Sequence, residues 1–496
     1  MTFVLAIDQG SGSSRAVVAS VAADGATTVR GYGSEPVASY FPAEHHVEHD
    51  ADELARTCVD AAQTALADAG MDWSQLAGVG LTGQTETIVA WDRDTGEAVA
   101  PAISWRDQRA PEPMEALSAA EQARFTTVTG LPLAPTWSAP KIRWILDAPG
   151  SAAADLAAKD RLALGDVASW VAYRLSDGAA HVTEPSFASR YGLMSLAELA
   201  WDAELLASFG VPASALPTIR PSDALDARVG ERLTTAGTPI VSALGDQQAA
   251  LYGHGGRRSG EAKLTMGTGA FLWANAGAEP PAATEGLVAT CAWAPATRPV
   301  AYALEGFLPN AGSVVTWLRT LGLLGADAWP TLDAATVTAP VVRALPAIAG
   351  LGTPYWAPHA RAVIEGMDSG STPEAVVEAC MLGVVHLIVD ALDATASSVP
   401  TEALLLDGGM SQNDGIAGAL ADLTGAVIHR STEEATVTGC ALLTAHALGI
   451  CDPDAGAVTH DATFTPRLST AAREEARAAW ARFIDRALAA HDDTEG

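Results

Sequence analysis

Apolar residues in the first half of the chain fall into continuous runs that alternate with helical spacing. Phe3 to Asp8 is an apolar run ending in a carboxylate, which is typical of a strand buried on both faces. The segment SRAVVASVAADG predicts a second strand, and the small polar stretch QGSGSS predicts a turn that exposes backbone donors. A helix is predicted from its cap at Asp50 to Gly70, and helices and strands alternate as far as Leu175. This alternation predicts an α/β fold.

The second half of the chain begins in the same style. Thr238 to Asp246 predicts another buried strand ending in Asp, and Ala262 to Gly277 predicts a strand, a Gly-rich turn and a strand. This layout resembles that of Leu5 to Gly25 and indicates an internal duplication. We therefore predict two domains, residues 1–237 and 238–496. No linker rich in Pro, Gly or Ser separates them, so the domains are expected to touch and to hinge.

The charge balance excludes a broad class of partners. The 496 residues include 29 basic and 59 acidic ones, for a net charge of -30, and 49% of the residues are apolar. Such a chain buries extensive cores, and its mean field repels nucleic acid and anionic membranes. An anionic nucleotide then needs a local site where backbone N–H groups, a metal ion or a few arginines reverse this field.

Cysteines and apolar segments indicate the compartment. The five cysteines lie far apart and form no C-x-x-C pair, so we expect them to be reduced, without a zinc site or disulfides. The N-terminus has no basic leader segment, and no segment looks long and apolar enough to predict a membrane span. These features predict a cytoplasmic protein.

Two familiar motifs are better explained by structure than by chemistry. GVGLTG, residues 78–83, matches G-x-G-x-x-G, but strand-like residues follow it where a dinucleotide fingerprint must open a helix. EHHVEHD, residues 44–50, contains His45 and His49, yet it lies between a Pro-containing loop and a helix cap, so a solvated loop is favoured over a metal site. A Walker A loop is excluded because none of the three lysines follows a Gly. Any nucleotide is therefore expected to bind without a P-loop lysine.

Asp8 and Asp246 form the sharpest pair of candidate residues. Each ends an apolar strand and precedes a small polar segment, so both carboxylates are expected to project from strand ends, where α/β proteins place ligands. Either one alone is as compatible with a turn as with catalysis. Their matched settings in the two halves favour a functional pair, with one carboxylate on each domain.

Five blocks, in order along nearly the whole chain, carry a resemblance to a known family. They are DQGSGSSRA (8–16), GDQQAALYG (245–253), MGTGAFL (266–272), GLGTPYWAPHARAVIEGM (350–367) and DGGMSQND (407–414). Together they resemble the FGGY carbohydrate kinases and, within that family, the glycerol kinases. The resemblance implies two actin-like, ribonuclease H-like ATPase domains of the α/β class, with ATP and substrate in the cleft between them.

The resemblance also implies how ATP and Mg²⁺ are held. The turns 10–14 and 267–269 would approach the phosphates from opposite sides, since glycine lets backbone N–H groups come close to anionic oxygens. Asp8 would hold Mg²⁺ through water, and Arg15 would steady the transferring oxygens. The implied ATP contacts are Gly10, Ser11, Gly12, Ser13, Thr268, Gly269, Gly312, Thr316, Gly409 and Asn413.

The implied substrate site contains the catalytic base. Asp246 would receive the hydroxyl proton, with Gln247 beside it on the substrate hydroxyls. The other family positions for the polyol fall on residues that we expect on the first domain: Gln84, Thr85, Glu86, Trp105, Thr136 and Phe271.

Three positions depart from the glycerol kinases. Those enzymes carry Arg where this chain has Thr85 and Tyr where it has Thr136, so both replacements enlarge the pocket and one removes a charged donor. Gly12 stands where a Thr is usual, which removes one phosphate contact. A larger polyol or a ketose therefore stays open as the substrate.

The sequence favours a polyol kinase that uses ATP, with glycerol as leading substrate and erythritol, other alditols or xylulose as alternatives. An actin-like or chaperone-like ATPase shares the ATP turns but does not need Asp246, Glu86 and Trp105 to converge on a sugar-sized pocket. A sugar sensor without turnover is a third alternative, against which the intact Asp8 and Asp246 pair argues. The resemblance also implies a homodimer or homotetramer.

Overall fold

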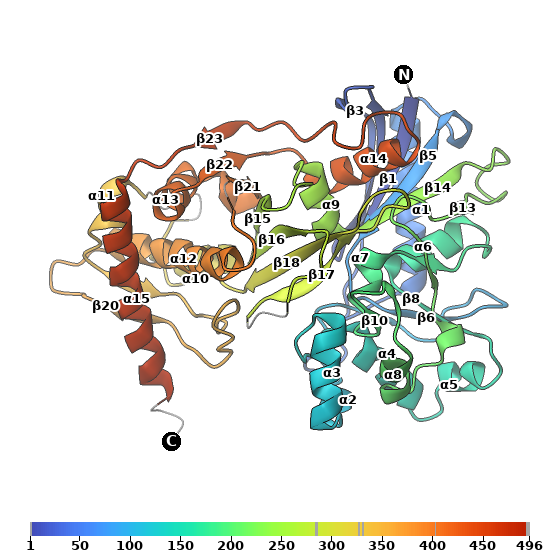
Figure 1. The fold of residues 1–496 in the computed structure, drawn as a ribbon, viewed down its shortest axis with the longest axis horizontal. Helices are drawn as coiled ribbons and strands as arrows, with labels where there is room; N and C mark the ends of the chain where they lie inside the picture. Colours follow the sequence, from blue (N-terminus) through green and yellow to red (C-terminus); the bar gives the residue numbers. More distant parts are fainter. Residues whose placement is uncertain (1, 283–285, 326–327, 330–331, 402, 493–496) are drawn as a thin grey trace.

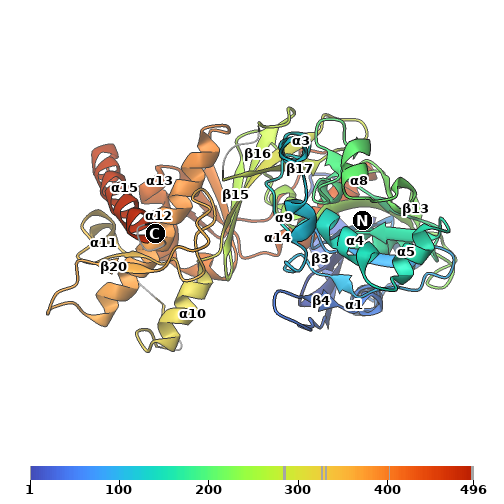
Figure 2. The ribbon, with the colours of Figure 1, turned by 90° about the horizontal axis from the view of Figure 1, so that it is seen from below.

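The computed structural model divides the chain between two β-sheets, each flanked by helices (Figure 1). Figure 2 shows the two halves side by side, with α9 (Asp246–Gly253) and α14 (Ala435–Ala447) between them. The structure describes residues 2–282, 286–325, 328–329, 332–401 and 403–492.

The first sheet is built around a strand that is buried on both faces. Its strands, from one edge to the other, are β13 (Ala227–Arg228), β14 (Pro239–Gly245), β5 (Gly78–Gly83), β1 (Thr2–Gln9), β2 (Ser13–Val21) and β3 (Thr27–Pro36). Every residue of β1 from Val4 to Gln9 is buried, as the apolar run predicts. Leu5 and Ile7 pack toward α1 (Ala51–Asp68), whereas Val4 and the other alternate positions pack toward α14.

The second sheet repeats the strand order of the first. Its strands are β17 (Val288–Trp293), β18 (Ala301–Leu308), β16 (Ala270–Gly277), β15 (Ala262–Met266), β21 (Ala403–Asp407), β22 (Val427–Arg430) and β23 (Ala462–Phe464). The order β18-β16-β15-β21-β22 matches β3-β2-β1-β5-β14, with antiparallel pairs followed by parallel pairs in both. This shared topology confirms the predicted duplication.

The structure corrects the domain boundary predicted between residues 237 and 238. The strand that follows this point, β14, pairs with β5 and is the last parallel strand of the first repeat. The second repeat opens with β15. The predicted boundary was wrong because apolar runs ending in Asp occur at both the first and the last strand of the first repeat. The second of these runs was therefore mistaken for the start of a new domain.

The helices lie on both faces of the two sheets (Figure 1). Asp50 caps α1 as predicted, since its side chain accepts the Glu53 N–H at 2.9 Å. The remaining helices of the first half are α2 (Glu112–Glu115), α3 (Ala119–Thr129), α4 (Ser138–Asp147), α5 (Ala152–Ala157), α6 (Val167–Leu175), α7 (Pro185–Ala188) and α8 (Ala203–Ser208). Those of the second half are α10 (Gly312–Thr320), α11 (Ala334–Thr338), α12 (Pro373–Ala396), α13 (Asp414–Thr424) and α15 (Thr470–Asp492).

Short strand pairs and turns of 3₁₀ helix complete the fold. The pairs are β4 (Glu48–His49) with β7 (Ala102–Ile103), β6 (Val89–Asp92) with β8 (Leu162–Gly165), β9 (Val182–Thr183) with β12 (Thr218–Ile219), β10 (Met194–Ser195) with β11 (Ala200–Trp201), and β19 (Arg343–Leu345) with β20 (Val363–Glu365). The 3₁₀ turns are Trp73–Gln75, Ala213–Ala215 and Gly409–Gln412.

Two helices that cross between the halves pack through glycine. A Cβ added at Gly439 of α14 would overlap the carbonyl oxygen of Ala249 in α9, and one at Gly253 would overlap that of Ala435. A side chain at either glycine would therefore force the helices apart. This crossing fixes α9, which begins at Asp246, against α14, a helix that packs on β1, β5 and β14 of the first sheet.

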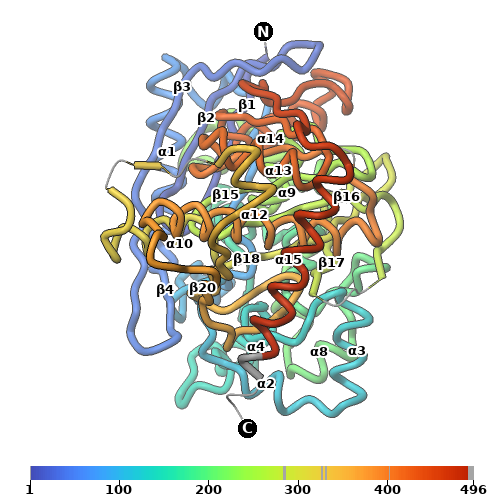
Figure 3. Tube along the Cα trace, turned by 90° about the vertical axis from the view of Figure 1, so that its left-hand side faces the viewer, coloured from blue at the N-terminus to red at the C-terminus, as the bar shows by residue number. Residues whose placement is uncertain are grey.

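Helix α12 overturns the expectation that no segment is long and apolar enough to span a membrane. By length and composition alone it qualifies, with 24 residues and a mean hydropathy of 2.0 over its most apolar stretch. However, 83% of that stretch is buried inside the protein, which is the setting of a core helix. Helix α15 lies along the outer side of this half (Figure 3), and its Trp480 stacks on His386 of α12.

Candidate active site

The two candidate carboxylates lie at one edge of the first sheet. Asp8 is near the carboxyl end of β1, Asp246 directly follows β14, and both strands run parallel to β5, in which Thr82 pairs with Asp8 on one side and Leu244 on the other. The carboxyl ends of neighbouring parallel strands meet at the same edge of a sheet. The two acids are therefore brought together, but both belong to the first sheet, which corrects the expectation of one carboxylate on each domain.

Burial makes both acids hard to ionise. Burial raises the pKa of Asp8 to about 7, with a further rise from the charge of Asp246 that Arg15 opposes. Burial likewise raises the pKa of Asp246 to about 6, although the Gln247 backbone N–H donates to its Oδ1 at 2.7 Å. Two such carboxylates form a site that a divalent cation would stabilise.

A cleft of about 320 Å³ opens next to these acids, and both halves line it. Arg15 and Gln247 come from the first half, and Lys263, Asp407 and Gly409 come from the second. The cleft is therefore not lysine-free: Lys263 lines it, although no P-loop lysine is present.

The turn between β1 and β2 leaves backbone open for a ligand. The Gly10 N–H closes the turn with a 3.0 Å hydrogen bond to the carbonyl of Ser13, and a Cβ added at Gly12 would meet no atom within 4 Å. The Ser11 hydroxyl is engaged by a side chain of the same half, because its Oγ accepts from Trp105 Nε1 at 2.9 Å. The turn predicted to bind phosphate is thus hydrogen-bonded to a residue predicted to contact the polyol.

Arg15 follows this turn and pairs with Asp8 in the β1–β2 register. Its Nη1 lies 3.0 Å from Glu434 Oε2, on the loop before α14. Both side chains are partly exposed, at 39% and 51%, so the pair is weak and an incoming phosphate can compete with Glu434 for the guanidinium.

The turn between β15 and β16 meets the start of α10. The Gly267 N–H donates to the Gly269 carbonyl at 2.9 Å, and the Gly312 N–H donates to the Gly267 carbonyl at 2.9 Å. These contacts place Thr268, Gly269 and Gly312 side by side. Thr316 lies one turn further along α10 and is exposed.

The Gly-Gly turn after β21 presses on the end of β15. Gly408 has a φ of 91°, and a Cβ there would overlap backbone atoms of Met266, so only glycine fits. Gly409 has open space around it and lines the cleft. Asn413 caps α13 by accepting the Ile416 N–H at 3.2 Å.

A buried arginine holds Glu86 and joins the two halves. Arg190 Nε donates to Glu86 Oε1 at 2.5 Å, and its Nη1 lies 2.7 Å from Glu305 Oε2 on β18. The three residues are only 5–7% exposed. Burial alone would lower the pKa of Arg190, but the two glutamates raise it, so the guanidinium stays charged.

The hydroxyls of Thr85 and Thr136 are both hydrogen-bonded within the protein. Thr85 Oγ1 donates to Glu86 Oε2 at 2.8 Å, and Thr136 Oγ1 donates to the Trp105 carbonyl at 2.8 Å. The buried Lys141 links these two segments, donating to the carbonyls of Thr136 at 2.5 Å and Glu86 at 3.3 Å. Neither threonine is thus positioned as a fixed donor to a substrate.

The two remaining polyol candidates differ in setting. Gln84 is 2% exposed, and its Nε2 donates to Gln9 Oε1 at 2.8 Å, so the protein itself engages its amide. Phe271 lies on β16 with its ring 5.0 Å from that of Phe307. Phe271 is therefore on the second sheet, which corrects the expectation that all polyol residues lie on the first domain.

Sequence reasoning missed several charged residues of this region. Lys263 and Glu305 lie within otherwise apolar buried strands, and Arg190 lies in a buried turn. His254 Nε2 lies 2.8 Å from Asp407 Oδ2; burial would raise the pKa of Asp407, but this hydrogen bond and the charge of Lys263 lower it to about 2. A lone charge inside an apolar strand is the signal that could have found Lys263 and Glu305.

The two motifs set aside from sequence have structural roles. GVGLTG is strand β5, buried throughout, and a Cβ at Gly80 would overlap Thr444 of α14. His49 is buried and its Nδ1 lies 2.8 Å from the Ala38 carbonyl, so the expectation of a solvated loop fails at this residue, whereas His45 is exposed. In the described part of the chain no group of three or more His, Cys, Asp or Glu could hold a metal ion.

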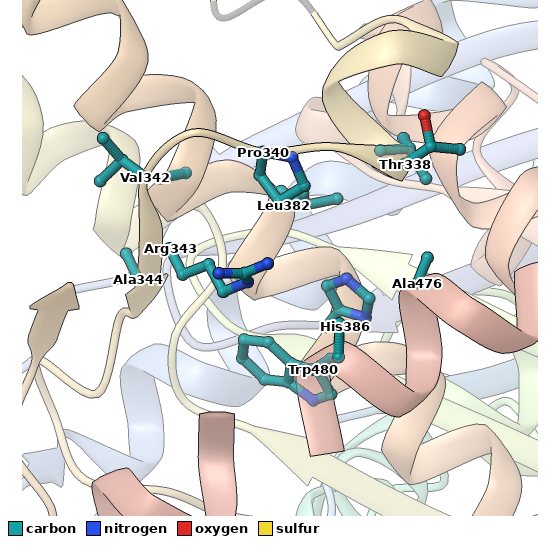
Figure 4. Close-up of a pocket in the computed structure, with 13 residues that line it drawn as sticks. Thr338, Pro340, Val342, Arg343, Ala344, Leu382, His386, Ala476 and Trp480 are labelled. Atoms are coloured by element: carbon teal, nitrogen blue, oxygen red, sulfur yellow. The ribbon is translucent and has the colours of Figure 1, made fainter. Parts of the chain in front are cut away.

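A small hollow between α12 and α15 lacks this chemistry (Figure 4). It has room for about 30 Å³, and Arg343, His386 and Trp480 line it. Burial lowers the pKa of His386 to about 3, so its ring is neutral. No carboxylate is present among the described residues that line the hollow, which separates it from the cleft.

Two sheets of one topology with a cleft between them define an actin-like ATPase fold of the α/β class. The structure superposes on Plasmodium falciparum glycerol kinase with ADP (TM-score 0.87, 26% identity, 98% of each chain) and on Rhodospirillum rubrum xylulose kinase (TM-score 0.83, 19% identity, 100% of each chain). The second likeness shows the fold alone.

Sequence comparison narrows this class to one family. The model of the N-terminal domain of the FGGY family of carbohydrate kinases matches residues 3–253, and that of the C-terminal domain matches residues 262–448. The glycerol kinase of Alkalilimnicola ehrlichii is 38% identical over 494 residues, covering 98% of both chains. This chain belongs to the FGGY family of carbohydrate kinases.

Proposed function

We propose that this kinase transfers the γ-phosphoryl group of ATP to a hydroxyl of glycerol, giving glycerol 3-phosphate and ADP. The observation that carries the proposal is the placement of Asp8 and Asp246 at one sheet edge beside a cleft that both halves line. The choice of glycerol as the substrate rests on full-length similarity to glycerol kinases, at 38% identity for the Alkalilimnicola ehrlichii enzyme.

Phosphoryl transfer depends on positioning, charge stabilisation and a base for the hydroxyl proton. Asp246 is the proposed base, because a pKa of about 6 leaves it ionised near neutral pH yet basic enough to accept a proton. Gln247 contacts the same hydroxyl. Arg15 exchanges Glu434 for the phosphate oxygens as the cleft closes on the nucleotide.

Magnesium fits the acid pair. Mg²⁺ is usually held by one or two carboxylates together with water and substrate phosphates, so the lack of a three-residue protein cage among the described residues is compatible with it. Asp8, with its raised pKa, is the proposed ligand through water. When bound, the ion would neutralise phosphate charge.

The nucleotide is proposed to lie against the glycine turns. Its phosphates would meet the backbone of the turn formed by Gly10, Ser11, Gly12 and Ser13, and that of Thr268, Gly269 and Gly312. The adenosine end would lie toward Gly409 and Asn413, with Thr316 at its edge. This arrangement supplies backbone N–H groups where a net charge of -30 would otherwise repel the ligand.

A larger polyol or a ketose is the second candidate substrate. The hydroxyls of Thr85 and Thr136 are both engaged by the protein, so neither side chain offers a fixed donor to a three-carbon substrate. Glu86 and Trp105 remain to accept hydroxyl hydrogens and to cover carbon atoms. Erythritol and xylulose are the test compounds for this alternative.

The deciding experiment measures ADP formation with Mg·ATP and a panel of glycerol, erythritol, longer alditols and xylulose. Glycerol is expected to give the highest kcat/KM. A maximum at erythritol or xylulose would transfer the assignment to the larger substrate. ATP turnover that ignores every compound would support an ATPase without a sugar substrate. We also propose that the protein is a cytoplasmic homodimer or homotetramer. Gel filtration tests the oligomeric state.

A further inference from the structure

One of the three lysines of the chain is buried at the cleft. Lys263 lies on β15 with 0% exposure, and it lines the cleft together with Gln247. Its Nζ donates to Gln247 Oε1 at 2.8 Å and to Thr265 Oγ1 at 2.8 Å. A long cationic side chain is rarely buried without a partner, so both contacts constrain it.

This contact fixes the orientation of the Gln247 amide. An ammonium group can only donate, so the amide must turn its oxygen toward Lys263. The –NH₂ group of Gln247 is then at the opposite corner, and in the described part of the chain it has no protein partner. Gln247 directly follows Asp246, the proposed base.

The carboxylates around Lys263 favour its charged form. Burial lowers its pKa, whereas Asp407, Asp246 and Glu305 oppose this shift. Lys263 in turn lowers the pKa of Asp246, against the larger effect of burial. The lysine thus interacts electrostatically with the proposed base of the first half and with two carboxylates of the second.

We propose that Lys263 is a positioning residue for the acceptor hydroxyl, which acts by presenting the Gln247 –NH₂ group as a hydrogen-bond donor to the hydroxyl oxygen beside Asp246. The inference rests on the proposed function, because the acceptor is the hydroxyl of a polyol. It explains why a charged residue occurs within a buried strand of the sheet that carries no proposed base.

The test is a double-mutant cycle of Lys263→Met, Gln247→Leu and the double variant, with Lys159→Met as control because Lys159 is exposed. The polyol is the most active compound of the panel. Each single variant is expected to raise the KM for the polyol about tenfold, with the KM for ATP changed less than twofold. The double variant should resemble either single one, because both remove the same contact. Lys159→Met should match the wild type.

A second variant tests the mechanism if Lys263→Met does not fold, which thermal unfolding would reveal. Gln247→Glu keeps an acceptor for Lys263 and removes the –NH₂ donor, so it should also raise the polyol KM about tenfold. Three results would overturn the role of Lys263 without touching the proposed function. They are an unchanged polyol KM in Gln247→Glu, effects of the single variants that multiply in the double variant, and a rise confined to the KM for ATP. A wild-type protein that forms no polyol-dependent ADP would overturn the proposed function and this inference together.

Discussion

The two halves of the molecule share a strand order and differ in where they carry charge. In the first sheet, Asp8 and Asp246 stand at the carboxyl ends of β1 and β14. In the second sheet, Lys263 and Glu305 lie within strands and reach toward residues of the first half. The comparison teaches that a duplicated scaffold can place the proposed catalytic acids on one copy and, on the other, charged residues that contact side chains near them.

The largest expected effect comes from the proposed base. Asp246→Asn should lower the kcat for polyol phosphorylation by about 10²- to 10⁴-fold, because general-base catalysis is lost. Asp407→Asn changes the strand-end acid of the second sheet, which is engaged by His254, and should cost about tenfold or less. Steady-state ADP formation by both variants measures the contrast. Equal losses would remove the proposed asymmetry between the halves.

The link between the halves should show in stability. Arg190→Met leaves Glu86 and Glu305 buried without their partner and should lower the free energy of unfolding by about 3–5 kcal/mol. Arg486→Met breaks an ion pair with Glu365 whose side chains are 59% and 35% exposed, and should cost less than about 1 kcal/mol. Urea unfolding followed by tryptophan fluorescence measures both. A loss below about 1 kcal/mol for Arg190→Met would contradict the linking role.

Activity should fall at low pH because the proposed base, which follows a strand of the first sheet, becomes protonated. Asp246 must be ionised to accept a proton, and its pKa is raised to about 6, so kcat/KM for the polyol should fall about tenfold per pH unit below pH 6. Asp407 stays ionised over this range, since its pKa is lowered to about 2. A pH profile at saturating Mg·ATP measures the limb. Constant activity down to pH 4.5 would exclude Asp246 as the base.

The smallest expected effect concerns the pocket wall. Thr85→Arg adds volume and a charged donor, and should shift the glycerol-to-erythritol ratio of kcat/KM about tenfold toward glycerol. The same panel of polyols measures the ratio. A uniform loss across the panel would contradict the assignment of Thr85 to the substrate wall.

The sequence predicted the repeated α/β architecture because apolar runs and glycine turns are local signals. It also predicted that Asp8 and Asp246 form a pair, since each ends an apolar run. It could not assign β14 to a sheet, because strand pairing depends on residues far apart in the chain, and it therefore placed Asp246 on the wrong half. Lys263, Arg190 and Glu305 were missed for the same reason: their partners are distant in sequence, and each alone is an isolated charge.

The most direct test of the account is to follow the γ-phosphorus of ATP by ³¹P NMR with glycerol and Mg²⁺ present, for the wild type and for Asp246→Asn. The account predicts that the wild type converts ATP to ADP and a glycerol phosphate ester in equal amounts, and that the variant leaves ATP intact on the same timescale. Release of inorganic phosphate without an ester, or undiminished ester formation by the variant, would contradict it.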